Sequence, residues 1–237
     1  MMYSPFFRFN VKKKATKTKK KRLKLTFSFN LKTGEKMSFK TSLSNILILF
    51  LIYSNSYAQQ TEVIELQERA WLARGNVVIA LNLKENLQVG DQIRTGKNSR
   101  VWLKLPDNSV VKLGEFAMFT IHDLKSSNNL LQGSFELLRG AFRLTTPPQT
   151  STKHDFKIKI NAITAGIRGT DIWGSIQTDK DLICLLEGQI SVQSGVLKAT
   201  LSKPRDYFIV SKNTEPTIGV LEDDEKLKEW VKSTELQ

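Results

Sequence analysis

The sequence predicts an all-β fold, a solenoid-like body or a roll of many short strands, with one short helix near the C-terminus. Between about residues 63 and 210, short apolar or alternating runs follow one another, and Val101–Leu105 is a clear example. Alternation of this kind is typical of a strand with one buried and one solvated face. Turn residues such as Gly90-Asp91, Pro106-Asp107-Asn108 and Arg139-Gly140 separate the runs about every 8 to 12 residues. This spacing favours short consecutive strands over alternating strands and helices.

Local patterns place the individual elements. Strands are expected within residues 76–81, 99–105, 109–113, 116–121 and 155–160. Trp102 interrupts the alternation of its strand, because it falls on the face that should be solvated, so it should cover a second core or a partner. The segment Thr145–Lys153, which contains two prolines, is expected to be a loop. In Glu222–Lys232, Leu227 and Trp230 have helical spacing and acidic residues occupy the first turn, which predicts the C-terminal helix.

The formal net charge of +13 is concentrated at the N-terminus. Residues 1–36 hold 12 lysines and arginines and one acid, whereas residues 59–237 hold 23 basic and 22 acidic side chains. The folded part of the chain should therefore be nearly neutral. Because nucleic-acid binding needs a basic surface on the folded domain, we expect no nucleic-acid partner.

Residues 37–58 are predicted to form a signal peptide. The apolar run 46–53 follows Lys40 and is much shorter than the roughly 20 residues that span a bilayer. Ser56-Tyr57-Ala58 has the small-x-small pattern of a cleavage site, so the mature chain should begin near Gln59 and reside in the periplasm.

Residues 1–36 then have two interpretations. They are either a basic, disordered or mis-annotated extension, added by an over-long gene model before a true start at Met37, or a genuine cytoplasmic tail on an uncleaved anchor. In the second case the uncleaved N-terminal segment would be the contact of the chain with a membrane.

The sequence offers no residue pattern with the spacing of a catalytic or metal site. Cys184 is the only cysteine and lies within the apolar run 182–186, so it should be a buried core residue. His122 and His154 stand beside aspartates at strand ends, where a structural role is favoured over catalysis. We therefore predict no enzymatic activity, no catalytic residues, no metal and no cofactor.

Three aspartates also favour a structural interpretation. Asp91, Asp107 and Asp171 are spread over separate turns. Aspartate side chains in turns commonly accept hydrogen bonds from backbone amides, so we expect this role and not an acid–base pair.

Four segments, in this order and spacing, resemble the FecR domain family. They are residues 87–109, with Gly90-Asp91-Gln92-Ile93-Arg94-Thr95-Gly96 and Pro106-Asp107-Asn108-Ser109, residues 132–142, residues 163–172, with Ile167-Arg168-Gly169-Thr170, and residues 186–192, with Glu187-Gly188. The resemblance defines a FecR-like β domain at 62–211, followed by a C-terminal tail with a short helix at 212–237.

The resemblance implies a solenoid-like β domain outside the cytoplasmic membrane. In the best-known members of the family, a cytoplasmic anti-sigma region, a membrane span and this periplasmic domain relay a signal from an outer-membrane receptor. The basic residues before the short apolar run do not resemble an anti-sigma region. The resemblance thus carries over the periplasmic binding module, but not control of a sigma factor.

Arg168, Trp102 and Trp173 are the candidate contact residues for a partner or ligand. Arg168 could bind an anionic group, although it could equally pair with a carboxylate of the fold, with Gly169 permitting a bend and Thr170 bonding locally. Trp102, Trp173 and the helical Trp230 could be core residues or an interface. Open strand edges offer a further route, by addition of a partner's strand.

The sequence thus predicts an exported, non-catalytic FecR-like protein that binds a partner protein or ligand in the cell envelope, with signalling as one form of that function. The alternative is a structural envelope protein that binds glycan or peptidoglycan. A hydrolase with an unrecognised site is a third hypothesis, which would need polar groups that meet in one pocket.

Overall fold

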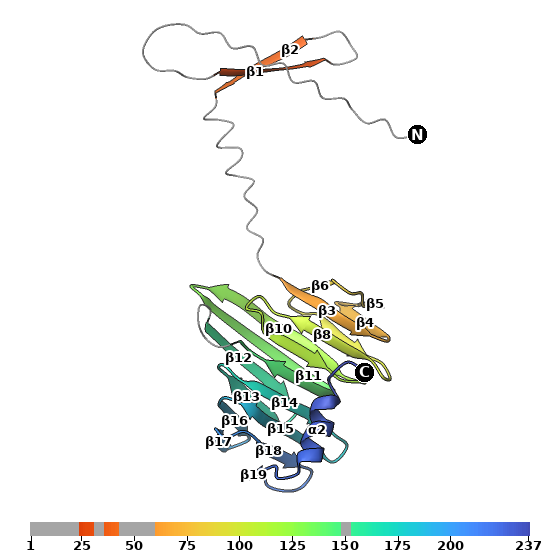
Figure 1. Cartoon of the computed structure of the whole chain (residues 1–237), viewed down its shortest axis with the longest axis vertical. Helices are drawn as coiled ribbons and strands as arrows, with labels where there is room; N and C mark the ends of the chain where they lie inside the picture. Colours follow the sequence, from red (N-terminus) through yellow and green to blue (C-terminus); the bar gives the residue numbers. More distant parts are fainter. Residues whose placement is uncertain (1–23, 31–35, 43–59, 148–152) are drawn as a thin grey trace. The chain divides into compact units, whose positions relative to one another are not determined.

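The computed structural model describes the chain in four stretches, residues 24–30, 36–42, 60–147 and 153–237 (Figure 1). The chain divides into two compact units, Met1–Tyr57 and Ala58–Gln237, and each is considered by itself. The predicted cleavage site near Ala58 lies outside the described residues, as does the middle of the loop expected over Thr145–Lys153.

The first unit contains a two-stranded antiparallel hairpin of β1 (Lys24–Asn30) and β2 (Lys36–Ser42). Strand β1 lies within residues 1–36, and the interpretation of these residues as a disordered or mis-annotated extension stays a prediction. Apolar and polar residues alternate through β1, which is the period of a strand.

The second unit contains strands β3 to β19 and helix α2 (Asp224–Lys232). The strands are β3 (Thr61–Gln67), β4 (Ala70–Arg74), β5 (Val77–Ala80), β6 (Asn86–Leu87), β7 (Gln92–Thr95), β8 (Arg100–Lys104), β9 (Val110–Leu113), β10 (Met118–Ser127), β11 (Leu130–Thr145), β12 (Lys153–Ile160), β13 (Ile163–Ile167), β14 (Asp171–Ile176), β15 (Lys180–Glu187), β16 (Ile190–Ser194), β17 (Leu197–Leu201), β18 (Asp206–Ser211) and β19 (Thr217–Val220). The predicted all-β fold with a short C-terminal helix is confirmed. The C-terminal tail adds one strand, β19, that the sequence analysis did not expect.

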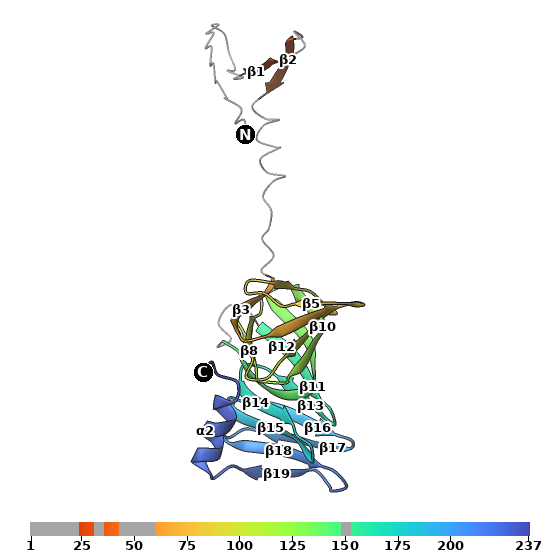
Figure 2. The same cartoon turned by 90° about the vertical axis from the view of Figure 1, so that its right-hand side faces the viewer.

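The strands form two layers that share β11 (Figures 1 and 2). The helix-side layer has the order β6–β3–β8–β9–β11–β14–β15–β18–β19. The opposite layer has the order β5–β4–β7–β10–β11–β12–β13–β16–β17. Within residues 60–147 and 153–237, neighbouring strands are antiparallel except for β11 and β12, which are parallel.

Strand β11 changes layer at Gly140. Its N-terminal part pairs with β10 and β12, and its C-terminal part pairs with β9 and β14. Gly140 has a φ of +83°, and a Cβ atom there would lie 2.6 Å from the Cα of Ala117. The sequence analysis expected a turn at Arg139-Gly140, whereas the structure has a bend within one long strand. Glycine is needed there because an L side chain would be both strained and blocked.

The main hydrophobic core lies between the two layers. Val101 and Leu103 point into it and are fully buried, which confirms the alternation predicted for this strand. Phe135 stacks on Phe119 and meets Phe156 edge-on, with both centroid distances at 5.6 Å. Strands from both layers therefore supply one continuous core.

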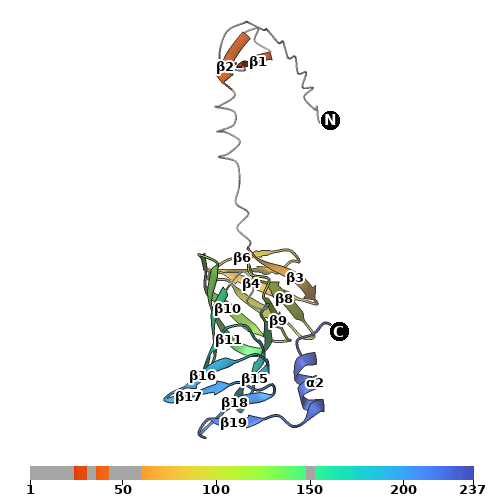
Figure 3. The same ribbon diagram turned by 60° about the vertical axis from the view of Figure 1, so that its left-hand side comes forward.

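Strand β15 is buried on both of its faces. Ile183 and Leu185 point into the main core, whereas Leu182 and Cys184 belong to a second apolar cluster on the outer side of the helix-side layer. Helix α2 covers this outer side (Figure 3). The cover explains why apolar residues run without alternation through this strand.

Candidate functional site

Helix α2 is a short amphipathic helix whose start is set by a capping residue. The Asp223 side chain accepts a hydrogen bond from the backbone N–H of Lys226 at 3.0 Å. Asp224 and Glu225 occupy the first turn, where the helix dipole favours negative charge. Trp230 is the buried residue of the helix, with 9% of its surface exposed. The helix therefore presents one aromatic anchor to the strands below it.

Trp173, one of the predicted contact residues, lies directly beneath this helix on β14. Its ring stacks on that of Trp230, with centroids 4.9 Å apart and planes inclined by 3°. Its Nε1 atom donates a hydrogen bond to Ser233 Oγ at 3.2 Å. Leu182 and Cys184 form the apolar floor beside it. Trp173 therefore contacts the C-terminal segment of its own chain.

Trp102, the second predicted contact residue, meets the end of the same segment. Its Nε1 atom donates a hydrogen bond to the backbone carbonyl of Thr234 at 3.1 Å. The Lys112 ammonium lies 4.0 Å from the centroid of the Trp102 ring, within cation–π distance. The sequence analysis expected Trp102 to cover a second core or a partner, and the structure places it against the C-terminal segment.

An ion network ties the last residues of the chain to the strands. Both carboxylate oxygens of Glu235 lie 2.8 Å from the Lys112 ammonium, and Arg143 donates to Glu235 Oε1 at 2.8 Å. Arg143 also holds Asp171 through two hydrogen bonds of 2.9 and 2.6 Å. The bond to Asp171, followed by Coulombic attraction, raises the pKa of Arg143. Fork-like pairing of this kind keeps the guanidinium charged and fixed in direction.

We call Trp102, Lys112, Arg143 and Trp173, with Leu182 and Cys184, the tryptophan face, and residues 222–237 the C-terminal segment. The face combines an apolar floor with two cations at one end. The structure thus brings two of the three predicted contact residues together beneath a cover made by the chain itself.

Arg168, the third predicted contact residue, lies apart from the tryptophan face, between β13 and β14. Its side chain is 74% exposed, and its Nε atom lies 3.4 Å from Asp155 Oδ1. Gly169 has a φ of +79°, and the backbone N–H of Thr170 donates to Thr146 Oγ1 at 2.6 Å. The bend and the local bond match the structural interpretation of this motif, while the guanidinium itself stays accessible.

Two of the three aspartates accept backbone hydrogen bonds, as the sequence analysis expected. Asp91 accepts the N–H of Gln88 at 2.8 Å and pairs with Arg74, and Asp107 accepts the N–H of Ser109 at 3.0 Å. Asp171 differs, because its oxygens accept from side chains, including those of Arg143 described above.

The two histidines occupy different environments. His122 is exposed, and its Nε2 lies 2.8 Å from Glu136 Oε2. Hydrogen bonds from His122 and Lys159 lower the pKa of Glu136. His154 is buried, stacks on the ring of Phe156, and has its Nδ1 atom 3.4 Å from Asp107 Oδ2. Burial lowers the pKa of His154 despite that nearby carboxylate, so this ring is neutral at physiological pH.

Cys184 is fully buried, as predicted. Burial raises the pKa of its thiol to about 12. Because the thiolate is the reactive form of cysteine, the folded protein holds this side chain as an inert apolar residue.

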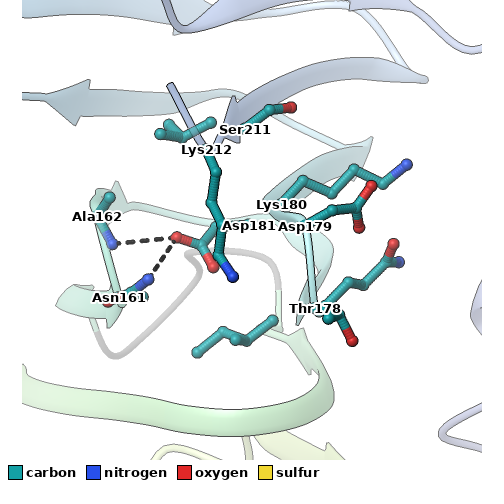
Figure 4. Close-up of a pocket in the computed structure, with 11 residues that line it drawn as sticks. Asn161, Ala162, Thr178, Asp179, Lys180, Asp181, Ser211 and Lys212 are labelled. Atoms are coloured by element: carbon teal, nitrogen blue, oxygen red, sulfur yellow. Dashed lines mark hydrogen bonds between the residues drawn. The ribbon is translucent and has the colours of Figure 1, made fainter. Parts of the chain in front are cut away.

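A polar depression of about 310 Å³ lies at the N-terminal end of β15 (Figure 4). Asp181 borders it and accepts hydrogen bonds from Asn161 Nδ2 at 2.8 Å and from the N–H of Ala162 at 3.3 Å. Asp179 and Lys212 also line it. Across the stretches that the structure describes, no group of three His, Cys, Asp or Glu side chains could hold a metal ion.

The comparisons with known proteins bear on this geometry. Residues 91–211 match the family model of the FecR protein, which is just over half of the 237 residues. The chain belongs to the FecR family. The matched region begins at Asp91 and ends at Ser211, the last residue of β18, so it includes most of both layers but not α2.

Two crystal structures of a candidate anti-sigma factor from Parabacteroides distasonis ATCC 8503 are similar to this FecR-family chain, each at 17% identity and with a TM-score of 0.49. The match covers 59% of this chain and 64% or 63% of the other, so the chain spans less than two thirds of those proteins. No curated protein matches the chain. Within residues 24–30, 36–42, 60–147 and 153–237, no helix is long and apolar enough to cross a membrane.

This FecR-family chain also has an open, apolar strand edge. Among the described residues, β5 pairs with β4 alone. Its residues Val77, Val78 and Ile79 are 60, 53 and 45% exposed. Figure 2 shows the β4–β5 hairpin extending away from the rest of the two layers. Strand addition at an open edge was predicted without naming the edge. Among the described residues, β5 is the edge strand with the longest run of consecutive exposed apolar residues.

Sequence reasoning missed the polar half of the tryptophan face, Lys112 and Arg143, and its partner Glu235 in the C-terminal segment. Glu235 is far from both cations in the sequence, and nothing in the local patterns distinguishes these residues from other surface charges. The available signal was the outward Trp102, whose unexpected position in its strand indicated that something covers it.

Proposed function

We propose that this FecR-family chain is an exported, non-catalytic module that binds a partner protein in the bacterial cell envelope and takes part in signalling. Membership of the FecR family supports the signalling role. The signal-peptide pattern of residues 37–58 supports export to the periplasm.

The observation that carries the proposal is the uncharged free edge of β5. A strand edge presents unpaired N–H and C=O groups, and soluble proteins usually protect such edges with charges, prolines or covering elements. Val77–Ala80 contains neither a charge nor a proline, and its side chains are exposed. An extended apolar segment of a partner can pair with this edge and bury those side chains.

The polar groups support a binding role over catalysis. Asp91, Asp107 and Asp171 are engaged in backbone hydrogen bonds or arginine pairs that hold the fold. The buried His154 is kept neutral, and the buried Cys184 is kept as a thiol. Asp107 and His154 lie close together, but both side chains are buried in the fold.

Site-specific photo-crosslinking in the source bacterium tests partner binding. A photoreactive amino acid at Val78 should give one discrete crosslinked product, whereas the same residue at Lys157, in the middle of β12, should not. Equal products from both positions, or none from Val78, would count against a partner at this edge. A second arm measures co-sedimentation with purified sacculi, because retention there would favour the alternative of a glycan-binding envelope protein.

Mass spectrometry of the protein from the envelope fraction tests export. The expected N-terminus is Gln59. An intact chain that begins at Met1 would instead support an anchored protein with a cytoplasmic tail.

A further inference from the structure

We infer that the tryptophan face is a helix-binding site, that the C-terminal segment is its exchangeable occupant, and that an acidic amphipathic helix of a partner can replace that segment. The replacing segment would carry an aromatic residue in its helix and, five residues later in the turn beyond the helix, a carboxylate. This surface is separate from the β5 edge, so the inference goes beyond the proposed function. If the inference is wrong, partner binding at the β5 edge is unaffected.

The tryptophan face needs a cover in every state of the protein. Trp173, Leu182 and Cys184 point away from the main core, and Tyr207 and Ile209 of β18 pack into the same outer cluster. Without a cover these side chains would form one contiguous apolar patch on a sheet surface. Patches of this kind are rare on soluble proteins unless another segment binds there.

The helix of the present cover buries few of its own side chains, and the residues after it add polar contacts and the buried Thr234. Trp230 is the buried side chain of α2, Leu227 and Val231 are partly buried, and the other six residues of the helix are exposed. A nine-residue helix is too short to be stable alone in water, so α2 depends on the face for its helical structure. Elements with so few buried contacts open at much lower free energy than the sheet beneath them.

The contacts define what kind of segment fits. The floor beside Trp173 accepts an aromatic ring at the position of Trp230. Trp102 donates a hydrogen bond to a backbone carbonyl, so this contact does not select the type of residue at that position. Lys112 and Arg143 converge on the carboxylate of Glu235, five residues after Trp230. The site therefore selects an aromatic residue and an acid at a fixed spacing.

Charge complementarity favours an acidic partner. When Glu235 leaves, Arg143 keeps Asp171 as its carboxylate, whereas Lys112 loses its one carboxylate partner among the described residues. The opened face thus carries one uncompensated positive charge beside an exposed Trp102 ring. A segment that brings a carboxylate to this end restores the pair.

Hydrogen exchange on the full chain tests whether the cover opens by itself. Backbone amides of residues 228–233 should exchange at least about 100-fold faster than those of β14 and β15, because the segment opens without global unfolding. Equal protection of the helix and these strands would overturn the inference. This measurement needs no variant and does not depend on any partner.

Peptide binding in trans tests the site. The probe is a fluorescent synthetic peptide with the sequence of residues 222–237. Its affinity for the full chain carrying Trp230→Ala should be at least about tenfold higher than for the wild-type chain, because the anchor of the competing segment is gone. A chain carrying Lys228→Ala, a change on the exposed side of α2, is the matched control and should behave as wild type.

Two peptide variants separate the recognition elements. Peptides carrying Trp230→Ala or Glu235→Lys should each bind the Trp230→Ala chain at least about tenfold more weakly than the parent peptide. If the Trp230→Ala chain keeps its β-sheet circular dichroism yet binds no peptide, the inference is wrong. If that chain fails to fold, the hydrogen-exchange result on the wild-type chain decides. Equal binding of the Glu235→Lys peptide would overturn the acidic character of the partner.

Discussion

The indole rings of Trp173 and Trp230 stack at 4.9 Å with a 3° tilt and join strand β14 to helix α2. The pair closes the second apolar cluster, and each partner is supported by polar contacts from the end of the chain. Because Trp230 is the buried side chain of the helix, this contact is the main apolar attachment of α2 to the outer side of the helix-side layer.

Replacing the aromatic anchor should destabilise the protein without abolishing the sheet. Trp230→Ala should lower the free energy of unfolding by about 2–4 kcal/mol, since it removes a large buried ring and loosens the helix. Trp230→Phe should cost only about 1 kcal/mol, because an aromatic ring remains on Trp173. Urea unfolding measures both. Lys228→Ala, which should change stability by less than about 0.5 kcal/mol, is the control, and equal losses in all three variants would contradict the anchor role.

The thiol of Cys184 should be unreactive in the folded protein. Its pKa is raised to about 12, so at pH 8 the folded state holds almost no thiolate and also shields the sulfur. A disulfide reagent such as Ellman's should react with the chain only after unfolding in urea. Rapid labelling of the native protein would contradict this prediction.

The raised pKa of Cys184 also means that the folded state retains a proton which the unfolded state loses above about pH 9.0. The free energy of unfolding should therefore fall as the pH rises beyond that value.

Burial of His154 should make the protein less stable in mild acid. Its pKa lies below the ordinary value of 6.5, so between those two values the unfolded chain binds more protons than the folded chain. The free energy of unfolding should therefore decrease as the pH falls below 6.5. In His154→Leu the decrease between pH 7.5 and 5.5 should be smaller than in the wild type. Urea midpoints at the two pH values measure the difference, and identical slopes would rule out His154 as the cause.

The layer change at Gly140 should not tolerate a side chain. Gly140→Ala combines a φ of +83° with a Cβ position 2.6 Å from the Cα of Ala117. We therefore expect the free energy of unfolding to fall by more than about 2 kcal/mol, or the chain to fail to fold. Gly195→Ala is the matched control, since Gly195 has a φ of +55° but open space around its Cβ position, and it should cost about 1 kcal/mol. Thermal unfolding compares the two, and equal effects would show that strain alone, without the steric block, accounts for the loss.

Local patterns were sufficient to predict the strands but not their arrangement. The alternation of Val101 and Leu103 determines which face is buried, and the acidic first turn followed by Leu227 and Trp230 determines an amphipathic helix. The glycine at position 140 was recognised as a special backbone position, yet its role in a layer change was not. A positive φ serves a tight turn and a strand bend equally, and only the contact with Ala117 distinguishes them.

The candidate residues show the same division. Trp102 and Trp173 were identified as aromatic residues in strands, without knowledge of what they face. Their common neighbour is the C-terminal segment, in which Ser233 lies 60 residues after Trp173 and Thr234 lies 132 residues after Trp102. Pairing over such separations depends on how the strands are ordered across the sheet, which no local pattern encodes.

The sequence by itself determined the all-β class, the short terminal helix, the buried Cys184 and the family, because each depends on residues that are close together or on motifs in a fixed order. Only the tertiary structure decided that β11 joins two layers, that β5 is left as an open edge, and that Lys112 and Arg143 meet Glu235 above the tryptophans. The physical reason is range: propensity and alternation act over a few neighbouring residues, whereas edges, covers and ion networks arise from packing between distant segments.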